Sequence, residues 1–169
     1  GLEFSVQVEE GLPQHIQSDQ DRLQQVLRNF LSNAMKFTQS GTISVEVSAV
    51  TPSLTHKLMT FGNLREQLRQ HPQNYIVFSI SDTGVGIPEE KHQLVFEAFQ
   101  QADGSTSRTY GGTGLGLSIS NQIAAMLEGA LALNSSTKTT DHGSTFSIVI
   151  PISPSMALSA VAETTAQLE

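Results

Sequence analysis

Three polar side chains in the first half of the chain are spaced so that they lie together. Asn29, Asn33 and Lys36 share one face of a helix predicted over residues 21–37, because residues three and four apart are neighbours on a helix surface. Amide oxygens suit a hard cation and an ammonium group suits phosphate, so the three side chains could hold Mg²⁺ chelated to a polyphosphate. Asn costs about 0.5 kcal/mol relative to Ala inside a helix, which favours a role in binding. A solvated polar face is the alternative interpretation.

The segment SDTGVGIP places a carboxylate at the end of a strand predicted over residues 75–82. Strand parity puts Asp82 in phase with Ile80, so its side chain is expected on the buried face. There it could accept a hydrogen bond from an exocyclic amine such as adenine N6, which a guanine carbonyl cannot donate. Gly84 and Gly86 would let the backbone turn tightly beside a flat ring. The alternative is that Asp82 only caps the turn.

The glycine-rich run GGTGLGL at residues 111–117 leads into a helix predicted over residues 114–129. Backbone amides at a helix N-terminus, together with the helix dipole, favour anions. The run is not a P-loop, because no Lys-Ser or Lys-Thr follows its last glycine. It is not a dinucleotide fingerprint either, because no parallel strand leads straight into it and no acidic residue lies about 20 positions on. A flexible hinge is the alternative.

Hydrophobic periodicity predicts the elements that must position these residues. Strands are expected over residues 2–8, 43–49, 75–82, 130–135 and 144–150, the first of them half-buried. Helices are expected over residues 21–37, capped by Ser18 or Asp19, over residues 88–96, starting from Pro88, and over residues 114–129, ending at a Gly129 cap. Residues 50–74 are expected to form an elaborated hairpin loop with a short helix near residues 64–69, and residues 98–113 a long loop.

Composition excludes several classes of function. The 169 residues, 18.2 kDa in mass, suffice for one domain, assigned to residues 1–151, with residues 152–169 as a linker or tail. No cysteine is present, which excludes thiol catalysis and thiolate metal sites. A net charge of -7 with only 9 Lys and Arg argues against non-specific binding to nucleic acid or anionic lipid. No apolar run has the length of a membrane span, and a chain that begins at Gly1 is expected to be a piece of a longer protein.

Four segments occur in an order that resembles one family. They are NFLSNAMKFT, SDTGVGIP, VFEAF and RTYGGTGLGLSIS. They are similar to the N, G1, F and G2 boxes of the ATP-binding domain of sensor histidine kinases, a member of the GHKL class with gyrase-type, Hsp90-type and MutL-type ATPases. The resemblance covers residues 2–151 and is greatest to hybrid kinases, which carry receiver domains. It implies the Bergerat fold, an α+β two-layer sandwich with a mixed sheet of about five strands covered on one face by three helices.

The resemblance also implies a site for ATP and Mg²⁺. Asn33 would be the principal Mg²⁺ ligand, Asn29 the assisting ligand and Lys36 a phosphate contact, and Asp82 would bind adenine N6. The catalytic residues would be Asn33, Lys36 and Arg108. The other implied nucleotide-binding residues are Phe37 beside the adenine, Gly84 and Gly86 in the turn, Gly112, Thr113, Gly114, Leu115, Gly116 and Leu117 near the phosphates, and Thr145 supporting the adenine through water, although parity places Thr145 out of phase with Phe146. Residues 98–113 would form a lid.

Two positions depart from the family pattern. Gln101 stands where many members have a lid Arg, which leaves the source of phosphate-neutralising charge open. The insertion at residues 50–74 is longer than usual.

Phosphotransfer is favoured over hydrolysis. Related hydrolytic ATPases place a Glu four residues before the metal-binding Asn, whereas this chain has Asn29 there, and an amide cannot act as a base. The acceptor would be a histidine on a separate dimerisation and phosphoacceptor helical domain of the parent, because His15, His56, His71, His92 and His142 lack the acceptor context. A response regulator or receiver domain would act downstream, in a cytoplasmic setting with a parent that could be an inner-membrane sensor. The alternatives are a catalytically silent nucleotide-sensing or docking module and a hydrolytic ATPase.

Overall fold

The computed structural model describes residues 1–59, 63–97 and 115–153. Its strands are β1 (Leu2–Val8), β2 (Gly41–Ser48), β3 (Leu58–Met59), β4 (Tyr75–Asp82), β5 (Ala130–Lys138) and β6 (Asp141–Pro151). Its helices are α1 (Gln20–Phe37), α2 (Pro52–His56), α3 (Leu64–Gln70) and α5 (Gly116–Met126), with the 3₁₀ turns η1 (Pro72–Asn74), η2 (Glu89–Lys91) and η3 (Leu94–Phe96). Within these residues, no helix combines the length and the apolar character needed to span a bilayer.

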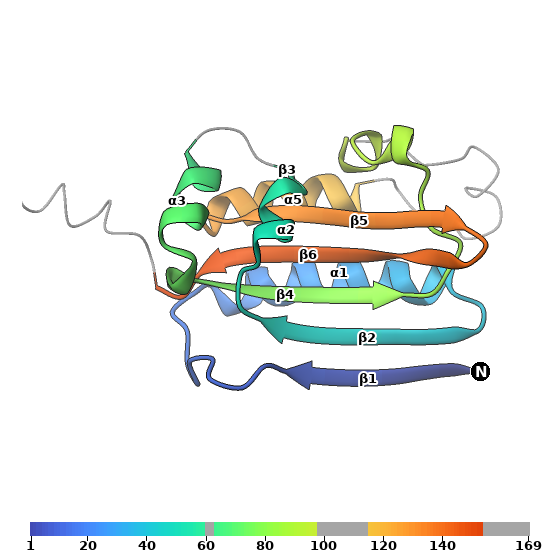
Figure 1. Ribbon diagram of the computed structural model, residues 1–169, viewed down its shortest axis with the longest axis horizontal. Helices are drawn as coiled ribbons and strands as arrows, with labels where there is room; N and C mark the ends of the chain where they lie inside the picture. Colours follow the sequence, from blue (N-terminus) through green and yellow to red (C-terminus); the bar gives the residue numbers. More distant parts are fainter. Residues whose placement is uncertain (60–62, 98–114, 154–169) are drawn as a thin grey trace, which may run out of the picture.

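The strands form one mixed sheet in the order β1-β2-β4-β6-β5-β3 (Figure 1). β1 runs parallel to β2, and every other neighbouring pair is antiparallel. The five predicted strands are all present, and the two-residue β3 adds a sixth. The predicted α+β class with a mixed sheet is therefore confirmed.

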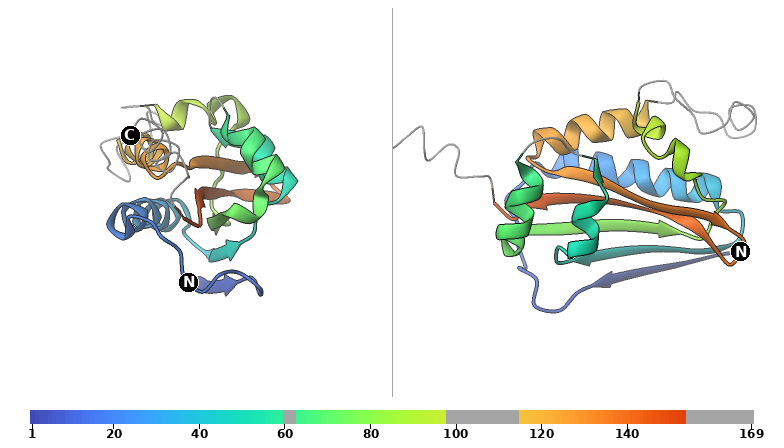
Figure 2. Two further views of the ribbon diagram at one scale, coloured as in Figure 1. Left: turned by 90° about the vertical axis from the view of Figure 1, so that its left-hand side faces the viewer. Right: turned by 45° about the horizontal axis from the view of Figure 1, so that its top comes forward.

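Two long helices, α1 and α5, lie side by side on one face of the sheet (Figures 1 and 2). α1 turns its apolar stripe inward, with Val26 and Phe30 fully buried against the inner face of the sheet. The Phe30 ring packs on Phe146 of β6, with 5.4 Å between ring centroids. The hydrophobic core therefore lies between the sheet and these two helices.

The helix predicted over residues 88–96 is wrong. The structure has the two 3₁₀ turns η2 and η3 there, and Pro88 keeps an extended ψ of 142° outside the first turn. Val95 and Phe96 are buried in the main core. The segment is therefore anchored by these two side chains and consists of two short turns instead of one continuous helix. In the described residues, the helix layer on this face consists of α1, α5 and these turns.

The insertion between β2 and β4 covers part of the opposite face of the sheet. α2 and α3 pack there around a second apolar cluster, in which Leu68 is 1% exposed and which also includes buried residues of β4, β5 and β6. The short helix predicted near residues 64–69 is present as α3, whereas α2 and β3 were not predicted. The insertion thus adds a layer that leaves the α1 and α5 face untouched (Figure 2).

Two further details differ from the expectations. β1 was expected to be half-buried, but it is exposed along its whole length, because the helix layer reaches Val45 and Val47 of β2 and stops there. The turn after α5 does not use Gly129 as a left-handed cap; Glu128 has the positive φ of 60°, and Gly129 is required because a Cβ would meet the Val149 carbonyl.

Residues 154–169 lie outside the described residues, so the boundary near residue 152 stays a prediction.

Candidate functional site

The polar face of α1 begins from a well-capped helix. Asp19 accepts a hydrogen bond from the Arg22 backbone at 3.1 Å, which confirms one of the two caps predicted. Burial of the apolar stripe fixes the rotation of α1, so that Asn29, Asn33 and Lys36 are all half-buried rather than solvated. The alternative of a freely solvated polar face therefore does not describe these side chains.

Asn29 is held at the contact between α1 and α5. Its Nδ2 donates to Ser120 Oγ at 3.0 Å, and Ser120 is 2% exposed. A Cβ on Gly116 would collide with Asn29 Oδ1, so glycine at this position lets the Asn29 side chain keep its place. The Asn29 amide is thus fixed beside the first turn of α5.

The N-terminus of α5 is suited to anions. Leu115 is its N-cap and makes no side-chain capping bond, and no acidic residue lies in the first turn, which includes Gly116 and Leu117. The first N–H groups of a helix have no intrahelical partner, and the dipole adds positive potential. The other predicted phosphate contacts, Arg108, Gly112, Thr113 and Gly114, and the predicted lid lie outside the described residues.

Asp82 ends β4 on the face that carries α1 and α5. Its register partners are Ile43 of β2, which is in the main core, and Ser144 of β6. Its Oδ1 accepts a hydrogen bond from the Gly84 N–H at 2.8 Å. Asp82 therefore has the predicted inward orientation and also caps the turn, with one carboxylate oxygen bonded to the Gly84 N–H.

Thr38, at the C-terminus of α1, lies beside this carboxyl group. Burial raises the pKa of Asp82 above its ordinary value, while the Gly84 backbone, the Thr38 hydroxyl and the Ser144 backbone act in the opposite direction. The Thr38 side chain is 2% exposed, and no partner in the described residues meets the full hydrogen-bond geometry for its Oγ1. A buried hydroxyl left without a hydrogen bond costs about 1–3 kcal/mol, so this pair of residues is suited to a ligand that supplies one.

Glycines keep the backbone close at this turn. A Cβ on Gly84 would meet the Phe37 carbonyl, and it would lie 2.8 Å from both Asp82 Oδ1 and Thr38 Oγ1. Gly86 has a φ of +74° and lies against the Ser136 carbonyl. A side chain at position 84 would therefore crowd Asp82 and Thr38, and glycine allows the turn to lie this close to them.

His142 and Ser135 hold this turn from the β5–β6 hairpin, and sequence reasoning missed both roles. His142 Nδ1 lies 2.7 Å from the Gly84 carbonyl, so the tautomer with a proton on Nδ1 donates to it. Ser135 Oγ accepts from the Ile87 N–H at 2.8 Å and donates to the Gly143 carbonyl at 2.7 Å. No sequence signal would have found them, because only the folded β5–β6 hairpin brings them to the glycine turn.

Thr145 is not brought to this site. Its Oγ1 lies 2.7 Å from Ser81 Oγ on the opposite face of the sheet. Ser144 takes the position beside Asp82, as the register of β4 and β6 requires. The assignment of Thr145 to the adenine is therefore wrong. The sequence already indicated this, because Thr145 alternates with the core residue Phe146 and so faces the other side of the sheet.

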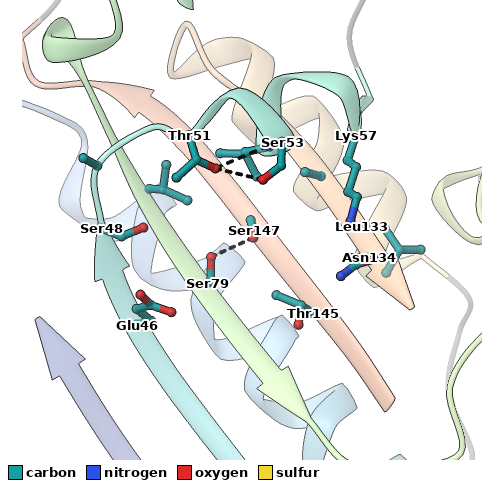
Figure 3. Close-up of a pocket in the computed structure, with 14 residues that line it drawn as sticks. Glu46, Ser48, Thr51, Ser53, Lys57, Ser79, Leu133, Asn134, Thr145 and Ser147 are labelled. Atoms are coloured by element: carbon teal, nitrogen blue, oxygen red, sulfur yellow. Dashed lines mark hydrogen bonds between the residues drawn. The ribbon is translucent and has the colours of Figure 1, made fainter. Parts of the chain in front are cut away.

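A groove of about 230 Å³ lies on that opposite face, beneath α2 (Figure 3). Its floor is formed by paired hydroxyls, with Ser79 Oγ 2.7 Å from Ser147 Oγ, and Thr145 also lines it. An antiparallel sheet whose outer face meets water has this polar character. The groove is separated by the sheet from Asp82 and α1, and we place the candidate site on the helix face.

A metal ion at this site would depend on amide oxygens. In residues 1–59, 63–97 and 115–153, no group of three or more His, Asp or Glu side chains could hold a metal. Asn33 lies one turn beyond Asn29 on α1, and Lys36 is in the last turn of that helix. Phe37 follows; it is 37% exposed, and its carbonyl accepts a hydrogen bond from the Val85 N–H of the Asp82 turn at 3.3 Å.

The fold and this arrangement define a class of protein. The chain belongs to the family of histidine kinase-, DNA gyrase B-, and HSP90-like ATPases, which it matches over residues 18–154. The resemblance to histidine kinase ATP-binding domains is thereby confirmed.

Its relatives are sensor kinases. It is 37% identical over 147 residues to hybrid signal transduction histidine kinase D of Dictyostelium discoideum, covering 85% of this chain and 9% of the relative. It is 35% identical over 146 residues to the signal transduction histidine-protein kinase BarA of Escherichia coli, covering 86% of this chain and 14% of the relative. The chain thus spans a small part of these curated relatives.

Solved structures agree with these relatives. Full-length ShkA in complex with AMPPNP superposes with a TM-score of 0.66 at 30% identity, covering 89% of this chain and 26% of that chain. The mycobacterial sensor histidine kinase MprB superposes with a TM-score of 0.63 at 26% identity, covering 89% of this chain and 81% of that chain.

Proposed function

We propose that this chain binds ATP with Mg²⁺ and delivers the γ-phosphate to a histidine on a separate helical domain, as part of a two-component signalling protein. The observation that carries the proposal is the pairing of Asp82, one of whose carboxylate oxygens is taken by Gly84, with the buried Thr38 hydroxyl that lacks a full hydrogen bond. Family membership, the hybrid kinase relatives and the AMPPNP complex of ShkA support it.

The residues around Asp82 fit an adenine ring. The second carboxylate oxygen would accept from the exocyclic amine, and Thr38 Oγ1 is placed to complete the polar contacts. Glycine at position 84 keeps any side chain away from Asp82 and Thr38, and the Phe37 ring would lie beside the adenine, as the family resemblance implies. Guanine would present a carbonyl to an acceptor, so ATP is favoured over GTP.

The phosphates and Mg²⁺ would be held at the α1–α5 junction. Asn33 and Asn29 offer amide oxygens to the metal, Lys36 a positive charge, and the first turn of α5 its backbone amides. ATP with Mg²⁺ supplies the activated phosphoryl group and part of the charge neutralisation. What the chain contributes is orientation of the nucleotide and exclusion of water.

The phosphoryl acceptor would come from another domain. All five histidines lie in the described residues, and none is on α1 or α5. His92 and His142 are engaged with the Ile87 and Gly84 carbonyls at 2.9 and 2.7 Å. We therefore propose a dimerisation and phosphoacceptor domain and a receiver domain as partners, in the cytoplasm.

Hydrolysis is disfavoured by position 29. The Asn29 amide cannot accept a proton from water, and its Nδ2 is engaged by Ser120. A domain without an efficient base hydrolyses ATP slowly, so bound ATP remains for transfer to the histidine.

Calorimetry and labelling together test the proposal. The 169-residue chain should bind ATP in the presence of Mg²⁺ more tightly than GTP, and Asn33→Ala should abolish the Mg²⁺ dependence. Addition of the helical phosphoacceptor domain of a hybrid kinase relative should then give acid-labile phosphate from labelled ATP. Absence of ATP binding would contradict the nucleotide site; binding without labelling would favour a silent nucleotide-sensing module, and phosphate release near once per second would favour a hydrolytic ATPase.

A further inference from the structure

β1 presents an apolar stripe to solvent. Its even-numbered side chains, Leu2, Phe4, Val6 and Val8, are 43%, 61%, 60% and 64% exposed. Their register partners on β2 include Ile43 and Val47, which belong to or pack against the main core, so the stripe continues the core face of the sheet beyond its covered part. Exposed apolar side chains in such a row are typical of an interaction surface.

The backbone of the same residues faces outward. The Gly1 carbonyl accepts from Gly41 and the Glu9 N–H donates to the Val47 carbonyl, so the odd-numbered residues of β1 direct their backbone groups toward β2. Because backbone groups alternate along a strand, the even-numbered residues direct theirs away from the sheet. A strand added at this edge would therefore pair with the residues that carry the apolar stripe.

This edge lacks the features that usually prevent association. Residues 2–8 contain no Lys, Arg, Pro or Gly, and Glu3 is their one charge. Natural edge strands are commonly protected by Lys, Pro, bulges or shortening. β1 is seven residues long, and all seven pair in register with β2.

The sequence of β1 is complementary to itself in antiparallel pairing. Centred on Ser5, Leu2 of one copy lies opposite Val8 of the other, Phe4 opposite Val6, and Glu3 opposite the neutral Gln7. This register joins even to even residues, as the outward backbone groups require, and it uses all seven residues. Side chains directly opposite in an antiparallel pair point to the same face, so the two stripes would pack together with no like charges opposed.

We propose that two copies of this chain pair antiparallel through β1, with Ser5 on the two-fold axis, to form one continuous sheet. The interface is isologous, and the backbone supplies its hydrogen bonds. β1 is the edge strand beyond β2, whereas α1 packs on β4 and α5. The pairing therefore does not depend on the proposed function, and it leaves the nucleotide site of each copy open.

Cysteine cross-linking tests the register, because the chain has no cysteine of its own. Ser5 lies in a pair without mutual hydrogen bonds, where Cα atoms are about 4.5 Å apart, within the range for a disulfide. With oxidised glutathione as the oxidant, Ser5→Cys should form a disulfide dimer, whereas Glu3→Cys or Gln7→Cys alone should not. A mixture of those two single variants should form a mixed dimer. Cross-linking of Ser5→Cys no faster than that of Glu3→Cys alone would overturn the proposal.

Charge substitutions opposite Glu3 test the interface without a covalent bond. Gln7→Lys should tighten the dimer measured by sedimentation and Gln7→Glu should weaken it, each by more than the same changes at the exposed Gln122 on α5. Phe4→Lys should weaken it about tenfold or more. A chain that stays monomeric at every concentration, or whose residues 2–8 gain protection from hydrogen exchange only when a helical domain of the parent is added, would overturn the proposal.

Discussion

Asn29 on α1 donates a hydrogen bond to Ser120 on α5, with 3.0 Å between Nδ2 and Oγ. This contact ties the proposed metal-binding face of one helix to the proposed phosphate-binding end of the other. The space for it is created by Gly116, where any Cβ would strike the Asn29 side chain. The geometry of the site therefore depends on two small residues of α5 as much as on the polar residues of α1.

Replacement of Ser120 should loosen the site. Ser120→Ala removes the acceptor of Asn29 Nδ2, and we expect a loss of about 1 kcal/mol in the free energy of unfolding. The affinity for ATP with Mg²⁺ should fall several-fold, because Asn29 is no longer oriented. Calorimetry and chemical denaturation measure the two effects. Ser118→Ala is the matched control, because within the described part of the chain its hydroxyl bonds the Leu115 carbonyl of its own turn, at 2.9 Å, and does not contact Asn29 through a hydrogen bond. An equal effect on affinity would argue against orientation.

Asp82→Asn should change base selectivity. Gly84 N–H already engages Oδ1, so the amide oxygen would remain at that position and Nδ2 would face the ligand. An amide donor opposes adenine N6 but can pair with guanine O6, and we expect the ratio of ATP to GTP affinity to fall at least tenfold, about 1.4 kcal/mol. Competition with a fluorescent nucleotide would measure the ratio. An unchanged ratio would remove Asp82 from base recognition.

The same carboxyl group predicts a pH dependence. Because burial raises the pKa of Asp82, the folded protein binds the proton more tightly than the unfolded chain does. This group's contribution to stability is therefore greatest below the unfolded pKa and is lost as pH rises through the folded pKa. Nucleotide binding should follow the opposite trend, because the ionised carboxylate is the better acceptor for adenine N6. Both trends should be absent in Asp82→Asn, as unfolding and titration at several pH values would show.

Sequence reasoning predicted the elements whose patterns are local. The apolar stripe and the Asp19 cap predicted α1 to within one residue, and alternation predicted the inward side chain of Asp82. The failures concern packing between distant elements. Alternation in residues 2–8 could not reveal that β1 lies at the edge beyond the helix layer, and the helical signals after Pro88 could not reveal that burial of Phe96 would break the segment into turns.

The site was predicted only as far as its motifs extend. Asn29 was expected at the metal and Gly116 near phosphate, but nothing in the sequence indicated that Ser120 holds Asn29 beside Gly116. Thr38 was missed because a threonine after a helix is common, and its importance comes from burial beside Asp82. The register of β4 and β6 decides between Ser144 and Thr145, and register is a property of the folded sheet.

Thr38 and Thr145 should respond differently to removal of the hydroxyl. Thr38→Val should weaken ATP binding several-fold and leave stability unchanged or slightly higher, because the buried Oγ1 has no full hydrogen bond to lose. Thr145→Val should cost about 1 kcal/mol of stability, through the loss of its bond to Ser81, and should leave ATP affinity unchanged. Thermal unfolding and calorimetry on both variants provide the comparison. Weaker ATP binding in Thr145→Val would show that Thr145 supports the adenine, contrary to the sheet register.

Leu68 tests whether the insertion is independent of the nucleotide site. Its side chain is 1% exposed in the second apolar cluster, on the face of the sheet opposite to α1 and α5. Leu68→Ala should therefore lower the free energy of unfolding by about 2–3 kcal/mol, at the lower end of the range for buried leucines because the cluster is small. Leu94→Ala, at a position 43% exposed, should cost much less. At temperatures where both variants remain folded, ATP affinity of Leu68→Ala should equal that of the parent chain, because the intervening sheet isolates the two faces. A loss of affinity greater than threefold, about 0.65 kcal/mol, would show that the insertion transmits strain through the sheet and belongs to the site.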